Sequence, residues 1–279
     1  MFDLGTSFTA SVARDPDALA IVDGEVRLSY AQWLARISSL VAAFDGIGLR
    51  AGDHFVTIMQ NRWEAASLHW ACQFAGLIMT PINWRAKPDE IDFVLENAGA
   101  KAIAFEAVSA AAMAESVLAR GLPRIAVGGD AGPADLSFSE MTATEAPTAT
   151  PRAGAEDWSL MLYTSGTTAK PKGVPRRHRA ERMAALAHVA QNLYGSGECT
   201  LGVMPLYHTM GVRSLLAMSL IGGTFVCLPR FDAARALELI EAERVSNLYL
   251  VPTLYHDVVH HPRFAAADVS CVRKLGFAG

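Results

Sequence analysis

Hydrophobic and polar positions along the chain follow two alternating patterns. Short apolar runs suited to buried strands alternate with longer segments in which apolar residues recur every three or four positions, as on one face of a helix. Residues 29–44 show the helical pattern, with Trp33 and Leu40 on one face and Ser29 and Gln32 as a capping-box pair. We expect strands at residues 54–60, 77–82, 101–105, 124–127, 158–164, 199–204, 224–228, 247–251 and 274–279. We expect helices at 29–44, 62–75 (capped by Asn61), 88–97, 179–193, 233–243 and 253–260, an alanine-rich helix that ends at 120 and a helix that follows 211. This alternation predicts crossover units and mostly parallel sheet.

The alternation breaks down between residues 128 and 157, where Gly, Pro, Ala, Thr and Glu predominate, and we interpret this stretch as a linker or a surface excursion. The predicted fold class is therefore α/β, with two mostly parallel sheets and helices between and around them. The first subdomain is expected to span residues 1–157 and the second residues 158–279. The chain ends on a predicted apolar strand, and no later segment follows that could pack against it. We therefore interpret the chain as a fragment whose second subdomain is truncated at its C-terminal end.

Composition narrows the functional classes. The 279 residues are 51% hydrophobic and 19% charged, as in an ordered globular protein. The 24 basic and 28 acidic residues give a net charge of -4, which argues against bulk attraction to nucleic acid. Four cysteines lie far apart, so neither a disulfide framework nor a thiolate metal site is predicted. The N-terminus does not resemble a secretory signal, and the longest apolar stretch is shorter than the roughly 20 residues of a membrane span. These features favour a cytoplasmic protein.

One loop carries most of the chemical information. Residues 163–173 read YTSGTTAKPKG and follow a predicted buried strand. Hydroxyl side chains and glycine provide O–H and N–H donors where the chain can bend around an anion. Lys172 adds a positive charge, and Pro171 stiffens the return of the loop. The spacing differs from that of a Walker phosphate loop. The segment predicts a polyphosphate site, and the alternative is a hydrophilic surface loop.

This string closely resembles the phosphate-binding signature of the adenylate-forming enzymes, which include acyl- and aryl-CoA synthetases, luciferases and the adenylation domains of peptide synthetases. The resemblance implies that the loop holds the β- and γ-phosphates of ATP while a substrate carboxylate attacks the α-phosphorus. Ala169 stands where the family usually has glycine and sometimes serine, and a positive φ there would cost about 1 kcal/mol. The residues implied to bind ATP are Thr164, Ser165, Gly166, Thr167, Thr168 and Lys172.

A second segment agrees with the first. Residues 203–211 read VMPLYHTMG and end a predicted strand, where ligands collect in open parallel sheets. The segment resembles the P-L-x-H stretch of acyl- and aryl-CoA synthetases, whose histidine lies beside the acyl carboxylate. The resemblance implies catalytic roles for His208 and Lys172 and substrate contacts for His208, Thr209 and Met210. Taken alone, a histidine is more often structural.

Further positions carry weaker signals. By resemblance, Arg85 would contact the phosphates of CoA, and Tyr249 and Ala278 would form the wall of the acyl pocket. The alternatives are an exposed loop arginine and ordinary core packing. We interpret the basic cluster at residues 176–182 as a solvated helix start, and the histidines at 256–261 as a helix end in preference to a zinc site. No metal site formed by protein residues is predicted.

The resemblance implies two half-reactions. A carboxylate and Mg²⁺-ATP give an acyl-adenylate and pyrophosphate, and the thiol of CoA then displaces AMP to give a thioester. ATP, Mg²⁺ and CoA are therefore the expected ligands, and an aryl or other compact ring carboxylate is the expected acid; homodimerisation is left open. The alternatives are a medium-chain fatty acid as substrate, or a non-catalytic nucleotide-binding fragment. The family's later motifs, including its C-terminal lysine, lie beyond this chain. We therefore expect the full-length parent to be active and the 279 residues alone to be inactive.

Overall fold

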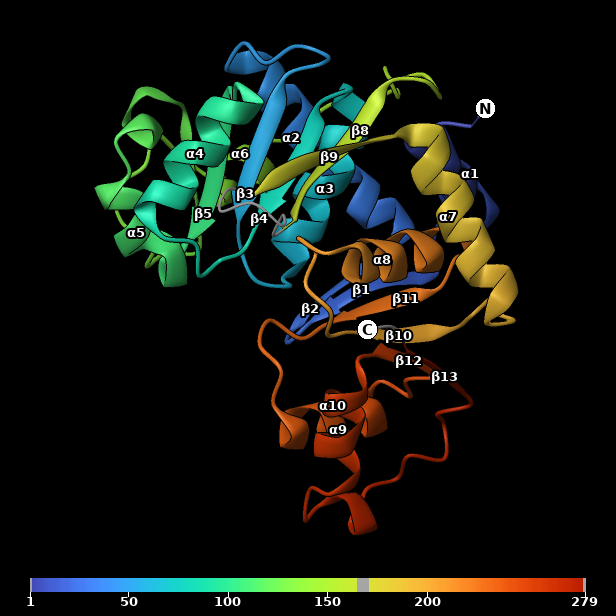
Figure 1. The fold of residues 1–279 in the computed structure, drawn as a ribbon. Helices are drawn as coiled ribbons and strands as arrows, with labels where there is room; N and C mark the ends of the chain where they lie inside the picture. The colour runs from blue at the N-terminus through green and yellow to red at the C-terminus, as the bar shows by residue number, and fades with distance from the viewer. Residues whose placement is uncertain (1, 165–170, 278–279) are drawn as a thin grey trace. The chain divides into compact units, whose positions relative to one another are not determined.

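The computed structural model describes residues 2–164 and 171–277 (Figure 1). The chain divides into two compact units. The first unit comprises Met1–Ser7, Leu34–Gln60 and Glu64–Glu181, and the second comprises Phe8–Trp33, Asn61–Trp63 and Arg182–Gly279. Within the described residues, one seven-stranded sheet and one six-stranded sheet form, and most neighbouring strands in both are parallel. The predicted α/β fold class with two mostly parallel sheets is confirmed.

The sheet of the first unit has the strand order β7-β6-β5-β3-β4-β8-β9. Its strands are β3 (His54–Ile58), β4 (Ile78–Ile82), β5 (Ala102–Glu106), β6 (Arg124–Val127), β7 (Leu136–Ser137), β8 (Trp158–Thr164) and β9 (Lys172–Arg177). All neighbours are parallel except β8 and β9, which form an antiparallel hairpin at one edge. Strand β8 pairs with β4, Met79 opposite Leu160. The chain therefore does not divide between residues 157 and 158 as the sequence suggested, because β8 and β9 extend the first sheet.

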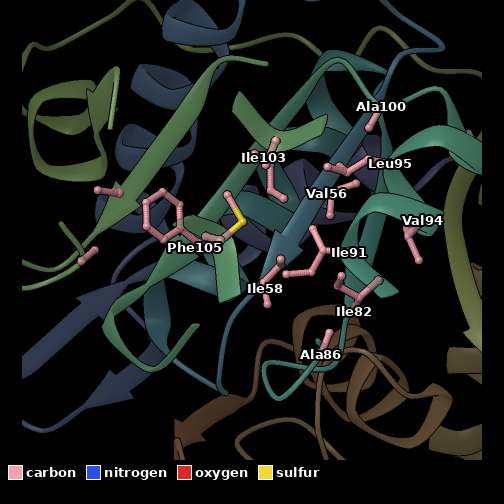
Figure 2. Packing of buried hydrophobic residues seen from close by; sticks show 14 residues of the cluster. Val56, Ile58, Ile82, Ala86, Ile91, Val94, Leu95, Ala100, Ile103 and Phe105 are labelled. Carbon is pink, nitrogen blue, oxygen red and sulfur yellow. The ribbon is translucent and has the colours of Figure 1, made fainter. Parts of the chain in front are cut away.

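A large apolar cluster of the first unit lies between α4 (Pro88–Ala98) and the seven-stranded sheet (Figure 2). Ile91 and Leu95 of α4 pack with Val56 of β3 and Ile103 of β5, and all four side chains are buried. Burying a side chain of this size stabilises the fold by about 1.5–3 kcal/mol. The other helices within this unit are short or follow its strands: α3 (Trp63–Ala75, starting in the second unit), α5 (Ala110–Glu115), α6 (Phe138–Ala143) and the 3₁₀ helices Ala107–Ser109 and Leu118–Gly121.

The sheet of the second unit has the order β13-β12-β10-β11-β1-β2. Its strands are β1 (Leu19–Asp23), β2 (Val26–Ser29), β10 (Cys199–Gly202), β11 (Thr224–Cys227), β12 (Asn247–Leu250) and β13 (Lys274–Phe277). Strand β1 is parallel to β11, Ile21 opposite Phe225, and antiparallel to β2. The helices within this unit are α8 (Thr209–Ile221), α9 (Ala233–Ala242), α10 (Pro252–Val259) and the 3₁₀ helix Phe264–Ala266. Helices α1 (Leu4–Arg14), α2 (Tyr30–Gly46) and α7 (His178–Gln191) contribute residues to both units.

Some helices and strands could be predicted from nearby residues in the sequence, and others could not. The capping pair before α2 forms as expected, since the Ser29 amide donates to Gln32 Oε1 at 2.9 Å and the Gln32 amide to Ser29 Oγ at 3.3 Å. The stretch expected to be a linker contains β7 and α6, which are too short to show periodicity. Strand β9 was not predicted because it contains Pro175, and proline is tolerated there because β9 is an edge strand. No helix in the described part of the chain combines the length and apolar character needed to cross a membrane.

Candidate functional site

The predicted phosphate loop connects the two strands of the β8–β9 hairpin. Thr164 at the end of β8 lies opposite Lys172 at the start of β9, and both are exposed. The remaining predicted ATP ligands, Ser165, Gly166, Thr167 and Thr168, lie outside the described residues, as does Ala169. The pairing of β8 with β9 therefore holds the two ends of the loop side by side on adjacent strands, which brings Thr164 and Lys172 together.

The hairpin is held in place by packing around Gly173. This glycine lies opposite Tyr163, and a Cβ atom there would be 2.9 Å from Met161 Sδ and 3.3 Å from Tyr163 Cζ. The Tyr163 ring therefore covers the position that glycine leaves bare. Its hydroxyl donates to Asn97 Oδ1 at 2.7 Å, which ties the hairpin to α4. Burial raises the pKa of Tyr163, so this hydroxyl keeps its proton near neutral pH.

The basic cluster lies at the junction of β9 and α7. Arg176 pairs with Glu181 at 3.1 Å, and Glu156 pairs with both Arg177 at 3.6 Å and Arg179 at 3.0 Å. These three arginines share two glutamates, so acidic partners offset part of the positive charge of the cluster.

Arg85 lies in the turn after β4 of the first unit. Its amide donates to Asn83 Oδ1 at 3.0 Å, and its guanidinium carbon lies 3.7 Å from the centroid of a Trp84 ring. Stacking on the indole holds the exposed charge near the surface of the turn. The turn is in the same unit as the hairpin, and the structure gives no contact between Arg85 and Lys172.

In the second unit, residues 205–210 (the PLYHTM segment) lead from β10 into the first turn of α8. His208 is the N-cap residue of α8, and its amide donates to the Pro205 carbonyl at 2.9 Å. Thr209 and Met210, predicted to contact substrate, form the first turn of the helix and are half-buried. The His208 ring packs against the Tyr207 ring with centroids 4.6 Å apart, and its side chain reaches solvent. Partial desolvation lowers the pKa of His208, so the imidazole is neutral near pH 7.

Asn61 holds this segment in place, a role that the sequence did not reveal. Its buried amide donates to the carbonyls of Gly202 at 2.9 Å and Met204 at 2.7 Å, and its Oδ1 accepts from the Leu206 amide at 2.9 Å. Asn61 was expected to cap the following helix, but α3 begins at Trp63. From its neighbours in the sequence alone, an asparagine between a strand and a helix is expected to cap the N-terminus of that helix. Nothing near it in the sequence indicates a partner about 140 residues away.

Gly211 allows the start of α8 to approach the same segment. A Cβ atom at this position would be 2.2 Å from the Pro205 oxygen and 2.3 Å from the Met204 oxygen. These are backbone atoms, and they cannot give way without moving the segment. The close approach therefore requires glycine and fixes the position of His208 relative to β10.

Tyr249 lies near the carboxyl end of β12, which pairs in parallel with β10. The carboxyl ends of parallel strands meet at the same edge of a sheet, so Tyr249 lies at the edge from which the PLYHTM segment leaves β10. Its half-buried ring contacts His188 with centroids 4.4 Å apart and also limits the space at Gly276, where a Cβ atom would be 3.0 Å from Tyr249 Cδ2. The Nδ1 atom of His188 lies 3.0 Å from the side-chain nitrogen of Asn192, and desolvation lowers the pKa of His188 to about 4. Ala278, the other predicted pocket residue, lies outside the described residues.

The histidines near the end of α10 pack against one another. His256 and His260 stack with centroids 4.0 Å apart, and His256 lies 3.6 Å from Asp257. In the two described ranges, no group of three or more His, Cys, Asp or Glu side chains is arranged to hold a metal ion.

Comparison with known proteins places this geometry in context. The chain is 30% identical to a feruloyl-CoA synthase of Amycolatopsis over 93% of its own length and 51% of the relative. It is 28% identical to a long-chain-fatty-acid–CoA ligase of Mycobacterium tuberculosis, over 88% of this chain and 48% of that one. The crystal structure of ATP-bound MatB from Rhodopseudomonas palustris superimposes with a TM-score of 0.85 at 25% identity, covering 99% of this chain and 55% of that one.

The chain spans about half the length of the curated relatives it matches. A model of the AMP-binding enzyme family matches residues 8–279, and this range includes both the β8–β9 hairpin and the PLYHTM segment. The resemblance inferred from these two segments is confirmed: the chain belongs to the AMP-binding enzyme family.

Proposed function

We propose that the protein carrying this chain is an ATP-dependent carboxylate–CoA ligase that forms an acyl-adenylate and then an acyl-CoA thioester. Family membership and relatives named as CoA ligases support the reaction class. The observation that carries the proposal is the β8–β9 hairpin, whose paired ends place Thr164 and Lys172 on either side of the phosphate-loop sequence.

In this proposal, the hairpin binds the β- and γ-phosphates of ATP. Lys172 supplies a positive charge to the leaving pyrophosphate, and Thr164 supplies a hydroxyl donor. The ladder and the Tyr163–Asn97 hydrogen bond hold both residues before ATP binds, which lowers the entropy lost on binding. Mg²⁺ would arrive with ATP, because it prefers phosphate oxygens and water as ligands. Arg85 would contact a phosphate of CoA.

The PLYHTM segment would hold the acid. A neutral His208 can donate a hydrogen bond to the carboxylate without neutralising it, so the carboxylate keeps its nucleophilic charge. Asn61 and Gly211 would fix the backbone from which His208, Thr209 and Met210 extend.

An aryl or other compact ring carboxylate is the substrate class that we favour. The half-buried Tyr249 ring offers a flat apolar face on which an aromatic acid can stack. The relative named feruloyl-CoA synthase supports an aromatic acid. The relative named long-chain-fatty-acid–CoA ligase supports the alternative, a fatty acid.

Nucleotide binding can be tested on this chain directly. Isothermal titration with Mg²⁺-ATP should give saturable binding, and ATP at about 100 times its Kd should stabilise the chain by about 2.7 kcal/mol. Lys172→Ala should weaken binding roughly tenfold to a hundredfold, because it removes a charge-assisted contact. Lys101→Ala, which removes another exposed lysine of the first unit, is the matched control. Equal affinities of the two variants would exclude the role of Lys172.

Turnover is tested on the full-length protein. With ATP and CoA, AMP release should depend on the added acid and should be faster with benzoates and cinnamates than with C6 to C10 fatty acids. A preference for the fatty acids would replace the aryl proposal with its alternative. Nucleotide binding without acid-dependent AMP release would indicate a non-catalytic nucleotide-binding protein. Pyrophosphate exchange by the 279-residue chain alone would contradict our expectation that these residues are inactive by themselves.

A further inference from the structure

Four buried polar side chains form a group in the first unit, away from the predicted ligand contacts. His69 and Gln73 lie on α3, Ser159 on β8, and His178 at the start of α7, and each is at most 2% exposed. One polar atom of each residue has no hydrogen-bond partner among the residues that the structure describes. These atoms are His69 Nε2, Gln73 Oε1, Ser159 Oγ and His178 Nε2. Buried polar atoms are rarely left unpaired, so four in one group require an explanation.

Hydrogen bonds and strand pairing connect these residues. The Gln73 amide nitrogen donates to the carbonyls of His69 and Ser159, both at 3.3 Å. The register of β8 and β9 shifts around Ser159, which is left without a partner in the ladder, as in a β-bulge that redirects a side chain. The His178 amide donates to the Asp157 carbonyl at 3.1 Å, two residues from Ser159. Burial lowers the pKa of His69, and His178, which lies within electrostatic range, lowers it further.

The hydrogen positions follow from these contacts. His178 Nδ1 accepts a hydrogen bond from the Leu4 amide at 3.3 Å, so in the neutral ring the proton is on Nε2. Burial lowers the pKa of His178 to about 4, against the opposing effects of Asp3 and Asp157, which keeps the ring neutral near pH 7. Both contacts of the Gln73 nitrogen are to carbonyl oxygens, which fixes Oε1 as the free acceptor. The group therefore offers an N–H donor, a carbonyl acceptor and a hydroxyl that does both.

We propose that His69, Gln73, Ser159 and His178 enclose an internal water site that joins α3 to the base of the β8–β9 hairpin. Water has two donors and two acceptors, which match this mixed set, and buried waters make about three hydrogen bonds each. A metal cation would be opposed by the Nε2–H of His178, and an anion by Gln73 Oε1. None of the four side chains carries a compensating charge. A neutral molecule with both donors and acceptors satisfies all four.

The first test needs no variant. A high-resolution crystal structure of the chain should show an ordered water within hydrogen-bond distance of at least three of the four unpaired atoms. In solution, the imidazole protons of His69 and His178 should show nuclear Overhauser contacts to a slowly exchanging water. An empty site, or side chains rotated to bond directly to one another, would overturn the proposal.

The second test asks whether two of the residues share one water. Gln73→Leu and His178→Phe should each raise the unfolding equilibrium constant roughly tenfold, because each leaves the remaining polar atoms unpaired. The double variant should raise it by clearly less than the product of the two effects, since the water is already lost in either single variant. Ile91→Val on α4, which packs in the apolar cluster of Figure 2, is the control and should combine with His178→Phe multiplicatively. A multiplicative result for Gln73→Leu with His178→Phe would count against a shared water.

Discussion

Asn61→Ala is expected to destabilise the second unit more than an ordinary polar substitution. The change removes three hydrogen bonds and leaves the carbonyls of Gly202 and Met204 and the amide of Leu206 without their partner. Each unpaired buried group costs about 1–3 kcal/mol, and Met204 is only half-buried, so water can reach part of the gap. We expect the free energy of unfolding to fall by about 3 kcal/mol, a large share of the 5–15 kcal/mol of a typical domain.

Asn61→Asp separates the hydrogen bonds from the volume of the side chain. The carboxylate can still accept from Leu206, but at pH 7 its other oxygen faces two carbonyl oxygens. The loss should therefore be at least as large as for alanine, although the shape of the side chain is kept.

Urea denaturation followed by circular dichroism measures these effects, with the slope m expected to stay unchanged. Asn83→Ala is the matched control, because Asn83 is exposed and accepts one backbone hydrogen bond, so its effect should be within about 0.5 kcal/mol. If Asn61→Ala cost no more than Asn83→Ala, Asn61 would not hold the PLYHTM segment, and our account of how His208 is positioned would be wrong.

Three further outcomes are expected. Gly211→Ala should lower stability by about 1–3 kcal/mol, because its Cβ would overlap the carbonyls that precede His208, whereas an unchanged urea midpoint would show that the segment can yield. Lys274→Met should lower the free energy of unfolding by about 1–3 kcal/mol, because it removes the ion-pair partner of buried Glu198 while the hydrogen bonds from Ser246 and Asn247 remain. Stability within about 0.5 kcal/mol of the parent would exclude this. Acid should destabilise the chain below about pH 6.5. Burial lowers the folded-state pKa values of His69 and His178 to about 3 and about 4 from 6.5, so the unfolded chain binds more protons as the pH falls. Between pH 6.5 and its folded-state pKa, each histidine should lower the free energy of unfolding by up to about 1.4 kcal/mol for each pH unit, and above pH 6.5 it should have no effect. A urea midpoint independent of pH between 7 and 5 would contradict this.

The fold class was predictable because it depends on periodicity, which long buried elements display. The strands β3 and β5 and the helix α4 appear in the sequence as apolar runs and an apolar face, and Gly99 marks the end of α4 with a left-handed φ of 62°. The sheet to which a strand belongs depends on pairing between distant segments. For this reason β8 was expected in the second subdomain although it pairs with β4.

The candidate site was predictable only where it coincides with a contiguous motif. Thr164, Lys172 and His208 stand in strings that resemble those of a known family. Asn61 and Gly211 act through backbone carbonyls, and every residue type has a backbone carbonyl, so the sequence carries no local sign of the contact. The antiparallel strand β9 was hidden by Pro175, whose tolerance depends on its place at the edge of the sheet.

The pairing of β1 with β11 has a consequence for how the chain folds as it is made. The hydroxyl of Thr224 donates to the carbonyl of Leu19 across 205 residues of sequence, and β1 lies between β2 and β11. At a synthesis rate of about 5–20 residues per second, the β1–β2 hairpin leaves the ribosome on the order of ten seconds or more before its parallel neighbour exists. A two-stranded hairpin is marginally stable in water by itself, and its unpaired edge can join other chains. We therefore expect slower elongation or a lack of chaperones to increase aggregation of the nascent chain, because either leaves its first strands unprotected for longer.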